Sequence, residues 1–429
     1  MFETLKNAWR NAELRKKLLY TLFILFIFRL GASIPVPFIN RELLANYFAT
    51  LDAAGGMLSY INVFTGGGLA NATLFAMSIT PYINASIILQ LLTVAIPALE
   101  NMVKEGGEEG RKKIASWTRY LAVVLGLIQG FSYYVMLRNA GLLTQTGVWA
   151  GIVIVLTFTA GTALIMWLGE HITQNGVGNG ISIILFAGIV SRGPALANSL
   201  LGLIQGGARG ALLAVLMVII GLALVVFIVY MSNAERRIPI QYAKRVVGRK
   251  MYGGQSTFLP IKVNATGVMP IIFASSILSL PATVFMFYTP QAGSIGSVIK
   301  DLFSQDNPFY IVLYAILIIA FSYFYASIQF NPVEIANNLK KNGGFIPGFR
   351  PGKPTADFIT KALAKVVFVG ALFLGVVALL PLIVGAFSTS LSNVAVGGTS
   401  VIIVVGVALE TVKQIEAQLM MRHHKGFLE

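Results

Sequence analysis

Side chains that could carry out catalysis are scarce in this chain of 429 residues. There is no cysteine, and the three histidines are His171, His423 and His424. A chain without cysteine has no thiolate nucleophile, no disulfide and no thiolate metal site. An intramembrane hydrolase would need a Ser/His pair, paired aspartates or an HExxH motif, but His171 directly follows Glu170 and no HExxH occurs. We therefore expect no enzymatic activity, no cofactor and no metal ion.

Charged residues inside or at the ends of the apolar segments are few, and they include Arg29 in the first segment, Glu170 at the inner end of the fourth and Glu410 in the tenth. A secondary transporter of a small solute would also have many spans and broken helices, but ionisable residues near its midplane normally couple ions to substrate. Such a transporter is the alternative function that the composition leaves open. Import of a preprotein into vesicles, as opposed to ion-coupled uptake of a solute, would separate the two functions.

The apolar residues are gathered into segments long enough to cross a membrane. A helix of about 18–25 apolar residues spans the ~30 Å hydrocarbon core of a bilayer. Ten such spans are expected: Leu18–Pro37, Ala76–Ile96, Ile114–Leu137, Val148–Leu168, Ile181–Leu200, Leu212–Met231, Val268–Phe287, Tyr310–Phe330, Val366–Phe387 and Val401–Met420. An even number of spans places both termini on the same side.

Most of the positive charge lies on one side of these spans. The net charge is +15, and 26 of the 32 Lys and Arg residues fall on the side of the two termini. Because cytoplasmic loops carry an excess of Lys and Arg, this asymmetry predicts that both termini are cytoplasmic. A soluble nucleic-acid-binding protein would also be basic, but a content of 56% hydrophobic residues excludes that class.

One glycine-rich segment, residues 55–76, is too short to cross a bilayer as a helix. It holds a turn or two of amphipathic helix before Gly66, Gly67 and Gly68. Irregular backbone at membrane depth is tolerated only where protein or a water-filled cavity surrounds it. The segment is therefore either a half-inserted helix that is hinged at the three glycines, or an external amphipathic loop.

Two long basic segments, 232–265 and 331–360, lie on the cytoplasmic side of this topology. A strand-like pattern at 237–242, followed by Val246-Val247 and Met251-Tyr252, predicts a hairpin-like arm in the first of them. An arm of this length is suited to docking a partner. The alternative is that both segments are solvated loops whose charge reflects only the membrane topology.

Seven runs of the sequence are specific enough to identify a family. They are MSITPYINASIILQLLTVAIP (77–97), KEGGEEGRKKIASWTRY (104–120), MWLGEHITQNGVGNGISIILFAGIV (166–190), ERRIPIQYAKRVVGR (235–249), STFLPIKVNATGVMPIIFASSI (256–277), FNPVEIANNLKKNGGFIPGFRPGKPT (330–355) and GGTSVIIVV (397–405). In this order, and over essentially the whole chain, they resemble the SecY family. Its members are pore-forming subunits of the bacterial protein-translocation channel.

The resemblance implies an all-α polytopic protein of the inner (cytoplasmic) membrane. Its ten transmembrane helices would form two inverted, pseudo-symmetric halves around a central hourglass pore, with a re-entrant plug helix. Residues 1–200 would hold spans one to five and the plug at about 55–76, and residues 201–429 would hold spans six to ten and both basic loops. The implied function is to move unfolded preproteins across the membrane and to release transmembrane segments sideways into it.

The resemblance also implies a constriction at the waist of the pore. Its six aliphatic side chains would be Ile79, Ile83, Ile181, Leu185, Ile272 and Ile403. A narrow aliphatic ring offers an ion nothing to replace its hydration shell, dewets when it is closed, and can yield around a passing polypeptide. Without the resemblance, isoleucines in helices would be assigned to the core or to the lipid-facing surface.

A plug and a lateral gate follow from the same resemblance. The plug residues would be Tyr60, Asn62, Phe64, Gly66, Gly67 and Gly68. The gate, where spans two and three meet spans seven and eight, would carry the polar residues Asn84, Ser86, Gln90 and Asn264. Asn264 is expected to oppose Gln90. Hydrogen bonds between helices in membranes contribute only ~0.6–2 kcal/mol each, so binding of a signal sequence can tip such a gate.

The two basic loops would receive the channel's cytoplasmic partners, the translating ribosome and the SecA ATPase. The residues implied in this contact are Arg236, Arg237, Lys244, Arg245, Arg249, Lys250 and Arg350. Ribosomal RNA is dense in phosphate, which suits exposed Lys and Arg. Arg350 lies in a turn-rich tip before Pro351, and the family relies on the matching arginine for export driven by SecA. Further implied partners are the small subunits SecE and SecG, preprotein signal sequences and membrane lipids.

Overall fold

The computed structural model describes residues 2–53, 62, 65–205, 207–242, 245–247, 250–252, 256–287, 294–304, 307–387 and 398–423. Helices make up most of it, as expected for a chain whose apolar segments need their backbone groups paired internally. The helices of the first part are α1 Phe2–Arg10, α2 Ala12–Gly31, α3 Arg41–Ala53, α5 Thr80–Ala95, α6 Pro97–Lys104, α7 Gly107–Asn139, α8 Val148–Asn175, α9 Gly180–Val190 and α10 Gly193–Gln205. The helices of the second part of the chain are α11 Ala208–Asn233, α12 Met269–Phe287, α13 Ile295–Leu302, α14 Pro308–Gln329, α15 Pro332–Lys341, α16 Lys353–Phe387 and α18 Gly398–His423.

Six helical segments among the described residues are long and apolar enough to cross a membrane. A seventh is obtained if α5 and α6, which meet at a bend of 104°, are taken as one broken span. The chain is therefore a multi-pass membrane protein. The six segments cover expected spans three, four, five, six, eight and nine: Gly107–Asn139, Val148–Asn175, Gly180–Gln205, Gly210–Asn233, Pro308–Lys341 and Lys353–Leu380.

The other expected spans are also helical but do not reach the same length and apolarity. α2 includes Arg15, Lys16 and Lys17 at its start and Arg29 near its end. α18 carries Glu410, Lys413 and Glu416, and the apolar part of α12 is short, Met269–Pro281. The count of ten spans remains a prediction, although each of the ten predicted segments falls on a helix of the structure.

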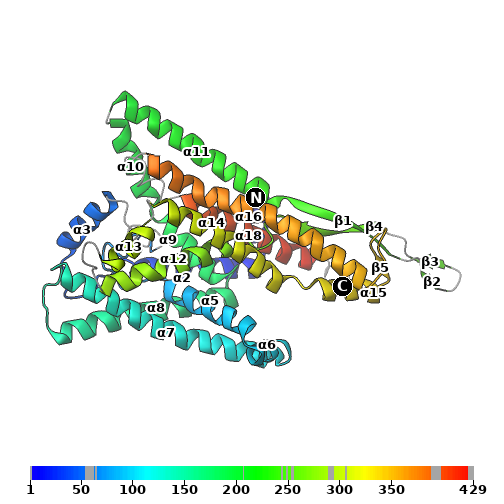
Figure 1. Ribbon diagram of the computed structural model, residues 1–429. Helices are drawn as coiled ribbons and strands as arrows, with labels where there is room; N and C mark the ends of the chain where they lie inside the picture. Colours follow the sequence, from blue (N-terminus) through cyan, green and yellow to red (C-terminus); the bar gives the residue numbers. More distant parts are fainter. Residues whose placement is uncertain are drawn as a thin grey trace.

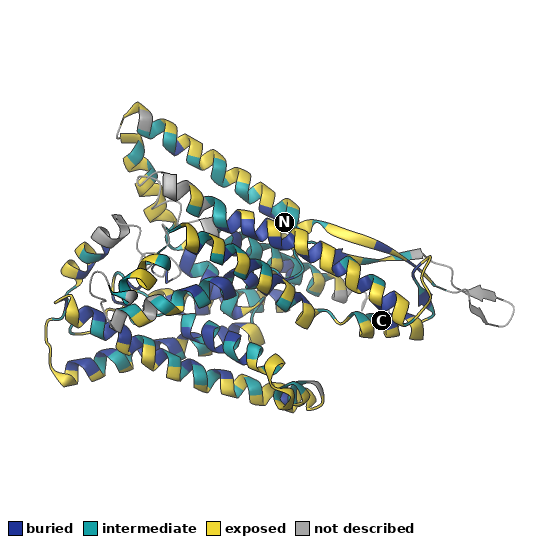
Figure 2. Cartoon of the chain, viewed as in Figure 1, coloured by how far each residue is buried: buried dark blue, intermediate teal, exposed yellow. Residues whose placement is uncertain are grey.

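The helices form one bundle with neighbours that are distant in sequence. α7 lies between α5 and α8, and α14 lies between α12 and α16. α18, the last helix, packs against α9, α11 and α16, and α1 lies against it as well. Figure 2 shows buried positions in the middle of the bundle and exposed ones along the outer helices α7 and α11. Exposed Leu222 and Val226 on α11 are typical of a surface that faces lipid.

Strands occur at one end of the bundle, which is a departure from a purely α-helical fold. β1 Glu235–Tyr242, β4 Ser256–Lys262 and β5 Gly344–Phe345 form an antiparallel sheet in the order β4-β1-β5. β2 Arg245–Val247 and β3 Lys250–Tyr252 form the expected hairpin, which extends beyond the sheet (Figure 1). α3 and α13 lie at the opposite end of the bundle in Figure 1.

The sheet joins the two basic loops, which the sequence presented as separate. Gln241 and Tyr242 of β1 pair with Phe345 and Gly344 of β5, so the second loop adds a strand to the first. Beneath the sheet lies an apolar cluster that includes Ile238, Ile240, Ile261, Leu339, Ile346, Ile359 and Leu363. The two loops are therefore one folded unit, seated on the start of α16.

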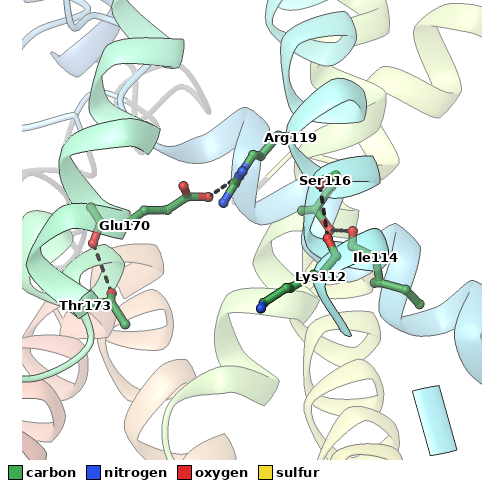
Figure 3. A network of polar contacts seen from close by, with 8 residues as sticks. Lys112, Ile114, Ser116, Arg119, Glu170 and Thr173 are labelled. Carbon is green, nitrogen blue, oxygen red and sulfur yellow. Dashed lines mark hydrogen bonds and ion pairs between the residues drawn. The ribbon is translucent and has the colours of Figure 1, made fainter. Parts of the chain in front are cut away.

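An ion pair connects α7 with α8 near the end where the strands lie. Arg119 Nε donates to Glu170 Oε1 at 2.7 Å, and the two side chains are 44% and 21% exposed (Figure 3). Hydroxyl groups nearby bond within their own helices: Ser116 donates to the Lys112 carbonyl and Thr173 to the Gly169 carbonyl. Glu170, at the inner end of the fourth expected span, is therefore paired with a basic side chain of a neighbouring helix.

We expect Glu170→Gln to lower the free energy of unfolding by about 1 kcal/mol, because a partly exposed ion pair contributes modestly. Exchanging the charges, with Arg119→Glu and Glu170→Arg together, should restore most of the loss. The measurement is the thermal unfolding of the purified protein in detergent. Glu108→Gln is the control, because its pair with Lys112 is far more exposed, at 78% and 90%. Equal losses of stability in Glu170→Gln and Glu108→Gln would contradict a stabilising role of the pair between Arg119 and Glu170.

Candidate functional site

The six candidate constriction residues lie on four separate parts of the chain. Ile79 and Ile83 are at the start of α5, Ile272 is on α12, and Ile403 is on α18. Ile181 and Leu185 are on α9, whose first turn is fixed by Asn179: its side-chain oxygen accepts from the backbone N–H groups of residues 181 and 182. Each helix thus carries one or two aliphatic side chains to the middle of the bundle.

The structure places all six of these residues in one apolar cluster. Ile79, Leu185 and Ile403 are fully buried within it. Ile83, Ile181 and Ile272 are partly buried and pack against it. The cluster also contains residues of α2, α8, α14 and α16, so it is the core of the bundle as well as the place where the six meet.

The described part of the candidate plug forms a turn that satisfies its own polar groups. Asn62 is 2% exposed, and its side-chain oxygen accepts from the Ala70 N–H at 3.0 Å. Its carbonyl oxygen accepts from the Thr65 hydroxyl and from the Gly67 N–H. Thr65 in turn accepts from the Leu69 N–H at 3.2 Å. Asn62 Oδ1 and the Thr65 hydroxyl are therefore both bonded within this turn.

Bonds to the rest of the protein begin at the end of this turn. Tyr133 of α7, only 1% exposed, donates its hydroxyl to the Leu69 carbonyl at 2.7 Å. The residues after Leu69 pair with the stretch that follows α2, because the Val36 N–H donates to the Ala72 carbonyl and the Leu74 N–H to the Ile34 carbonyl. Residues 69–74 are thus the root by which the turn is held.

Two close contacts seat this segment against neighbouring helices. Gly66, with φ of +66°, lies so close to α9 that an added Cβ would come within 2.7 Å of the Gly188 carbonyl and 2.9 Å of Ser191 Oγ. Only glycine fits both this backbone conformation and this approach. Further along, the Phe75 ring stacks on Phe28 of α2 at 5.7 Å between centroids.

Of the other expected plug residues, Gly67 and Gly68 lie in the same turn as Gly66. Tyr60 and Phe64 lie outside the described residues. Nothing in the sequence indicated that Tyr133 belongs to this site, because a tyrosine within an apolar span would be assigned to the core. Its role becomes visible only from its hydrogen bond to Leu69, on a distant segment.

Of the candidate gate residues, Asn84, Ser86 and Gln90 are on α5, which packs against α7 and α12. Asn264 precedes α12, in the stretch between β4 and that helix, and its backbone lies beside Gly370 of α16. Asn84 Oδ1, Gln90 Oε1 and Asn264 Oδ1 are buried and have no hydrogen-bond partner among the described residues. Burying a polar atom without a partner costs about 1–3 kcal/mol.

The expected pairing of Gln90 with Asn264 is not formed in the structure. Gln90 Nε2 bonds to Ser86 Oγ at 3.4 Å, one turn earlier on the same helix. The physical reason is local: residues four apart on a helix face the same way, so Ser86 is always within reach of Gln90.

The candidate docking residues are distributed over the sheet and its hairpin. Ile238 and Ile240 of β1 point into the cluster beneath the sheet, while Arg236 and Arg237 are exposed. Arg237 Nε donates to Glu235 Oε1 at 2.7 Å, so its charge is partly compensated. Arg245 and Lys250 belong to the β2–β3 hairpin, and Lys244 and Arg249 lie outside the described residues.

Arg350 is exposed at a tight turn between β5 and α16. The Phe349 N–H before it donates to the Ile346 carbonyl, and Thr355 Oγ1 donates to the Arg350 carbonyl at 2.8 Å. Gly352 follows with φ of +105°, a conformation that glycine adopts without strain. The backbone that carries Arg350 is held on both sides.

Among the described residues, no group of three or more His, Asp or Glu side chains is arranged to hold a metal ion. The ionisable residues of the expected spans are not gathered either. Arg29 and Glu410 are exposed, and Glu170 is paired with Arg119. The arrangement offers an apolar waist, a self-contained turn beside it, a polar boundary between helices, and a basic platform at one end.

Comparison with known proteins shows the family of the chain. The sequence model of the SecY family matches residues 73–412. The protein translocase subunit SecY of Streptomyces scabiei is 44% identical over 439 residues, and that of Halalkalibacterium halodurans is 46% identical over 437 residues. Both alignments cover 100% of this chain and 100% of the relative.

Solved structures with the same fold are more distant in sequence. One described as the structure of a protein conducting channel matches with a TM-score of 0.63 and 19% identity, over 94% of this chain and 92% of that one. A Sec61 chain from a canine ribosome-channel complex matches with a TM-score of 0.60 and 17% identity, over the same shares. At this level of identity the likeness concerns the fold.

We expect Tyr133→Phe to destabilise the protein by about 1 kcal/mol, because the buried Leu69 carbonyl loses a donor but keeps its bond from the Ala72 N–H. Thermal unfolding in detergent measures the change. Tyr134→Phe is the matched control, since Tyr134 is also buried and no hydrogen bond of its hydroxyl occurs among the described residues. A loss that is as large for Tyr134→Phe would show that the hydroxyl at 133 does not tether the segment.

Proposed function

The chain belongs to the SecY family, and we propose that Ile79, Ile83, Ile181, Leu185, Ile272 and Ile403 form the constriction through which it conducts preproteins. As a protein translocase subunit, it is a protein-conducting channel of the membrane. The observation that carries the proposal is that six residues from four distant parts of the chain belong to one apolar cluster in the core of the bundle.

An aliphatic constriction suits a channel that must pass many sequences and yet hold back ions. Hydrocarbon side chains cannot replace the hydration shell of an ion, and a narrow apolar ring expels water. The same side chains can change rotamer around an extended polypeptide. A ring with polar side chains would hold water and leak when at rest.

In this proposal the segment around residue 62 is the plug, and the root at 69–74 is its hinge. Asn62 and Thr65 bond to backbone groups of the same turn, so these bonds can move with the turn when it leaves the bundle. The contacts that must break include the bond from Tyr133 and the approach of Gly66 to α9. A segment of this kind can be displaced as a unit.

The boundary between α12 and the α5–α7 pair is the proposed lateral gate. Asn84, Gln90 and Asn264 each have a buried oxygen without a partner in the described structure. Parting the helices would allow water or an entering signal sequence to bond to these oxygens, which offsets part of the cost of opening. The gate is therefore held closed by packing more than by hydrogen bonds.

The joined sheet and hairpin are the proposed platform for the ribosome and for the SecA ATPase. Exposed Arg236 and the hairpin residues Arg245 and Lys250 suit contact with RNA phosphates. Arg350 is proposed to contact SecA, because a guanidinium on a stiff turn is presented at low entropy cost. The ribosome is proposed as a partner because the related Sec61 chain was solved in a ribosome-channel complex. SecE, SecG, signal sequences and membrane lipids are proposed as further partners because the chain belongs to the SecY family.

Residues 1–200 and 201–429 are proposed to be the two halves of the channel, in the inner membrane with both termini in the cytoplasm. The positive-inside asymmetry supports this orientation. A secondary transporter is not supported, because the ionisable residues of the expected spans do not converge on a binding site. Transport of preproteins that depends on SecA and ATP, without ion-coupled solute uptake, is the test.

Replacing Ile83 or Ile272 with Ser should produce a measurable ion leak through the resting channel, because a hydroxyl keeps water in the constriction. Recordings of single channels in planar bilayers measure it. Ile316→Ser is the matched control, because Ile316 on α14 is 56% exposed and lies on the outside of the bundle. Resting conductance at the wild-type level in both constriction variants would refute the proposed ring.

Arg350→Glu should abolish import driven by SecA, and Arg350→Lys should weaken it if the guanidinium makes paired contacts. The stability of the channel should change by less than about 0.5 kcal/mol, because Arg350 is exposed. ATP-dependent import of a preprotein into vesicles with normal channel levels is the measurement.

Lys353→Glu controls for the charge of this loop, because Lys353 is exposed and lies three residues further along. An equal loss with Lys353→Glu would indicate general attraction to a basic surface. Full import with Arg350→Glu would show that Arg350 has no role in export driven by SecA.

A further inference from the structure

We propose that Thr355 is a positioning residue for Arg350, acting through the backbone that carries the guanidinium. The inference rests on the proposed contact between Arg350 and SecA. Thr355 is in the first turn of α16 and its side chain is 2% exposed, so it cannot itself touch a partner protein. Its hydroxyl nevertheless reaches the Arg350 carbonyl, five residues back, at 2.8 Å.

The hydrogen bond from Thr355 fixes the backbone on the C-terminal side of Arg350. Two further contacts fix it on the N-terminal side. The Phe349 N–H donates to the Ile346 carbonyl at 3.1 Å, and Ile346 is buried in the cluster beneath the sheet. The Phe349 ring packs against Phe358, one turn beyond Thr355 on α16, at 4.2 Å between centroids and with the ring planes tilted by 33°. The exposed side chain of Arg350 therefore follows a packed ring, and the carbonyl of the same residue is bonded.

This arrangement selects one direction for the Arg350 side chain. A free turn with Gly348 and Gly352 at positive φ would sample several backbone conformations, and each would aim the guanidinium elsewhere. A partner that binds the arginine would then have to order the turn, at a cost to affinity. The hydroxyl of Thr355 orders it beforehand. Valine has nearly the same shape as threonine but cannot donate, so it isolates this effect.

The alternative is that the hydroxyl only stabilises the start of α16. The two roles predict different kinetics. A fold-stabilising bond, once lost, would lower the melting temperature and the amount of channel, but would not change how much SecA is needed for half-maximal activity. A positioning bond, once lost, would raise that concentration and leave the maximal rate nearly unchanged, because the bound state is the same.

The experiment uses vesicles that contain the complete channel complex at normal levels. SecA is titrated while its ATPase activity and the import of a preprotein are measured. Thr355→Val should raise the half-saturating SecA concentration by about three- to tenfold, the range of one ordinary hydrogen bond. Thr355→Ser, which keeps the hydroxyl, should restore the wild-type value.

Thr360→Val is the matched control, because Thr360 also donates its hydroxyl to the backbone of α16, to the Ala356 carbonyl at 2.9 Å. It should leave the half-saturating concentration unchanged. In an Arg350→Ala background, Thr355→Val should have no further effect, because a positioning residue has nothing left to position. Phe358→Leu, which removes the ring contact with Phe349, should act in the same direction as Thr355→Val.

The outcomes separate the two proposals. If Arg350→Ala supports import at the wild-type level, the contact with SecA is refuted and the role of Thr355 with it. If Arg350→Ala impairs import but Thr355→Val has no effect, or has the same effect with and without Arg350, the contact stands and the positioning role is refuted. Failure of Thr355→Ser to restore the wild-type value would also refute it.

Discussion

Hydrocarbon offers no partner to a backbone N–H or C=O group, and this constraint shapes every part of the protein that lies among the spans. A helix satisfies this constraint by itself, because its backbone groups bond to one another within the segment. Residues 65–78 do not form a regular helix and meet this constraint by other means: side chains cap the turn, and residues 72–74 pair with the stretch that follows α2. Tyr133 supplies a further bond from a neighbouring span.

The apolar cluster and the polar boundary have opposite properties, and the proposed function needs both. The cluster brings together aliphatic side chains whose burial stabilises the closed bundle without directional bonds. The proposed gate residues Asn84, Gln90 and Asn264 instead bury oxygens that have no partner among the described residues, which costs stability. We propose that a channel that opens both across and along the membrane benefits from a non-directional constriction and from a weaker lateral gate. Neither feature involves catalysis.

At the end of the bundle that carries the strands, the decisive feature is the joining of two loops. The strand β5 contributes only Gly344 and Phe345, yet it connects the loop after α15 to the sheet after α11. Ile238, Ile240 and Ile346 then bury a common core with the start of α16. As a result, the exposed arginines of the first loop and Arg350 of the second are carried by one folded unit. A partner that engages both loops meets a preformed surface, and α16 connects that surface directly to the bundle.

The sequence by itself determined the class and the family of this protein, and it predicts the orientation. Apolar runs of membrane length, one-sided positive charge and the absence of cysteine are properties of composition, so no knowledge of contacts is needed to read them. The strand pattern at 237–242 was also correct, because alternation is local. Tertiary structure alone decided which distant residues meet: Tyr133 with Leu69, Thr355 with the turn at Arg350, and β5 with β1. It also decided against a bond between Gln90 and Asn264, because Ser86 was the nearer partner on the same helix. The physical reason is that a hydrogen bond depends on positions within a few tenths of an ångström, and packing sets those positions only after the helices have assembled.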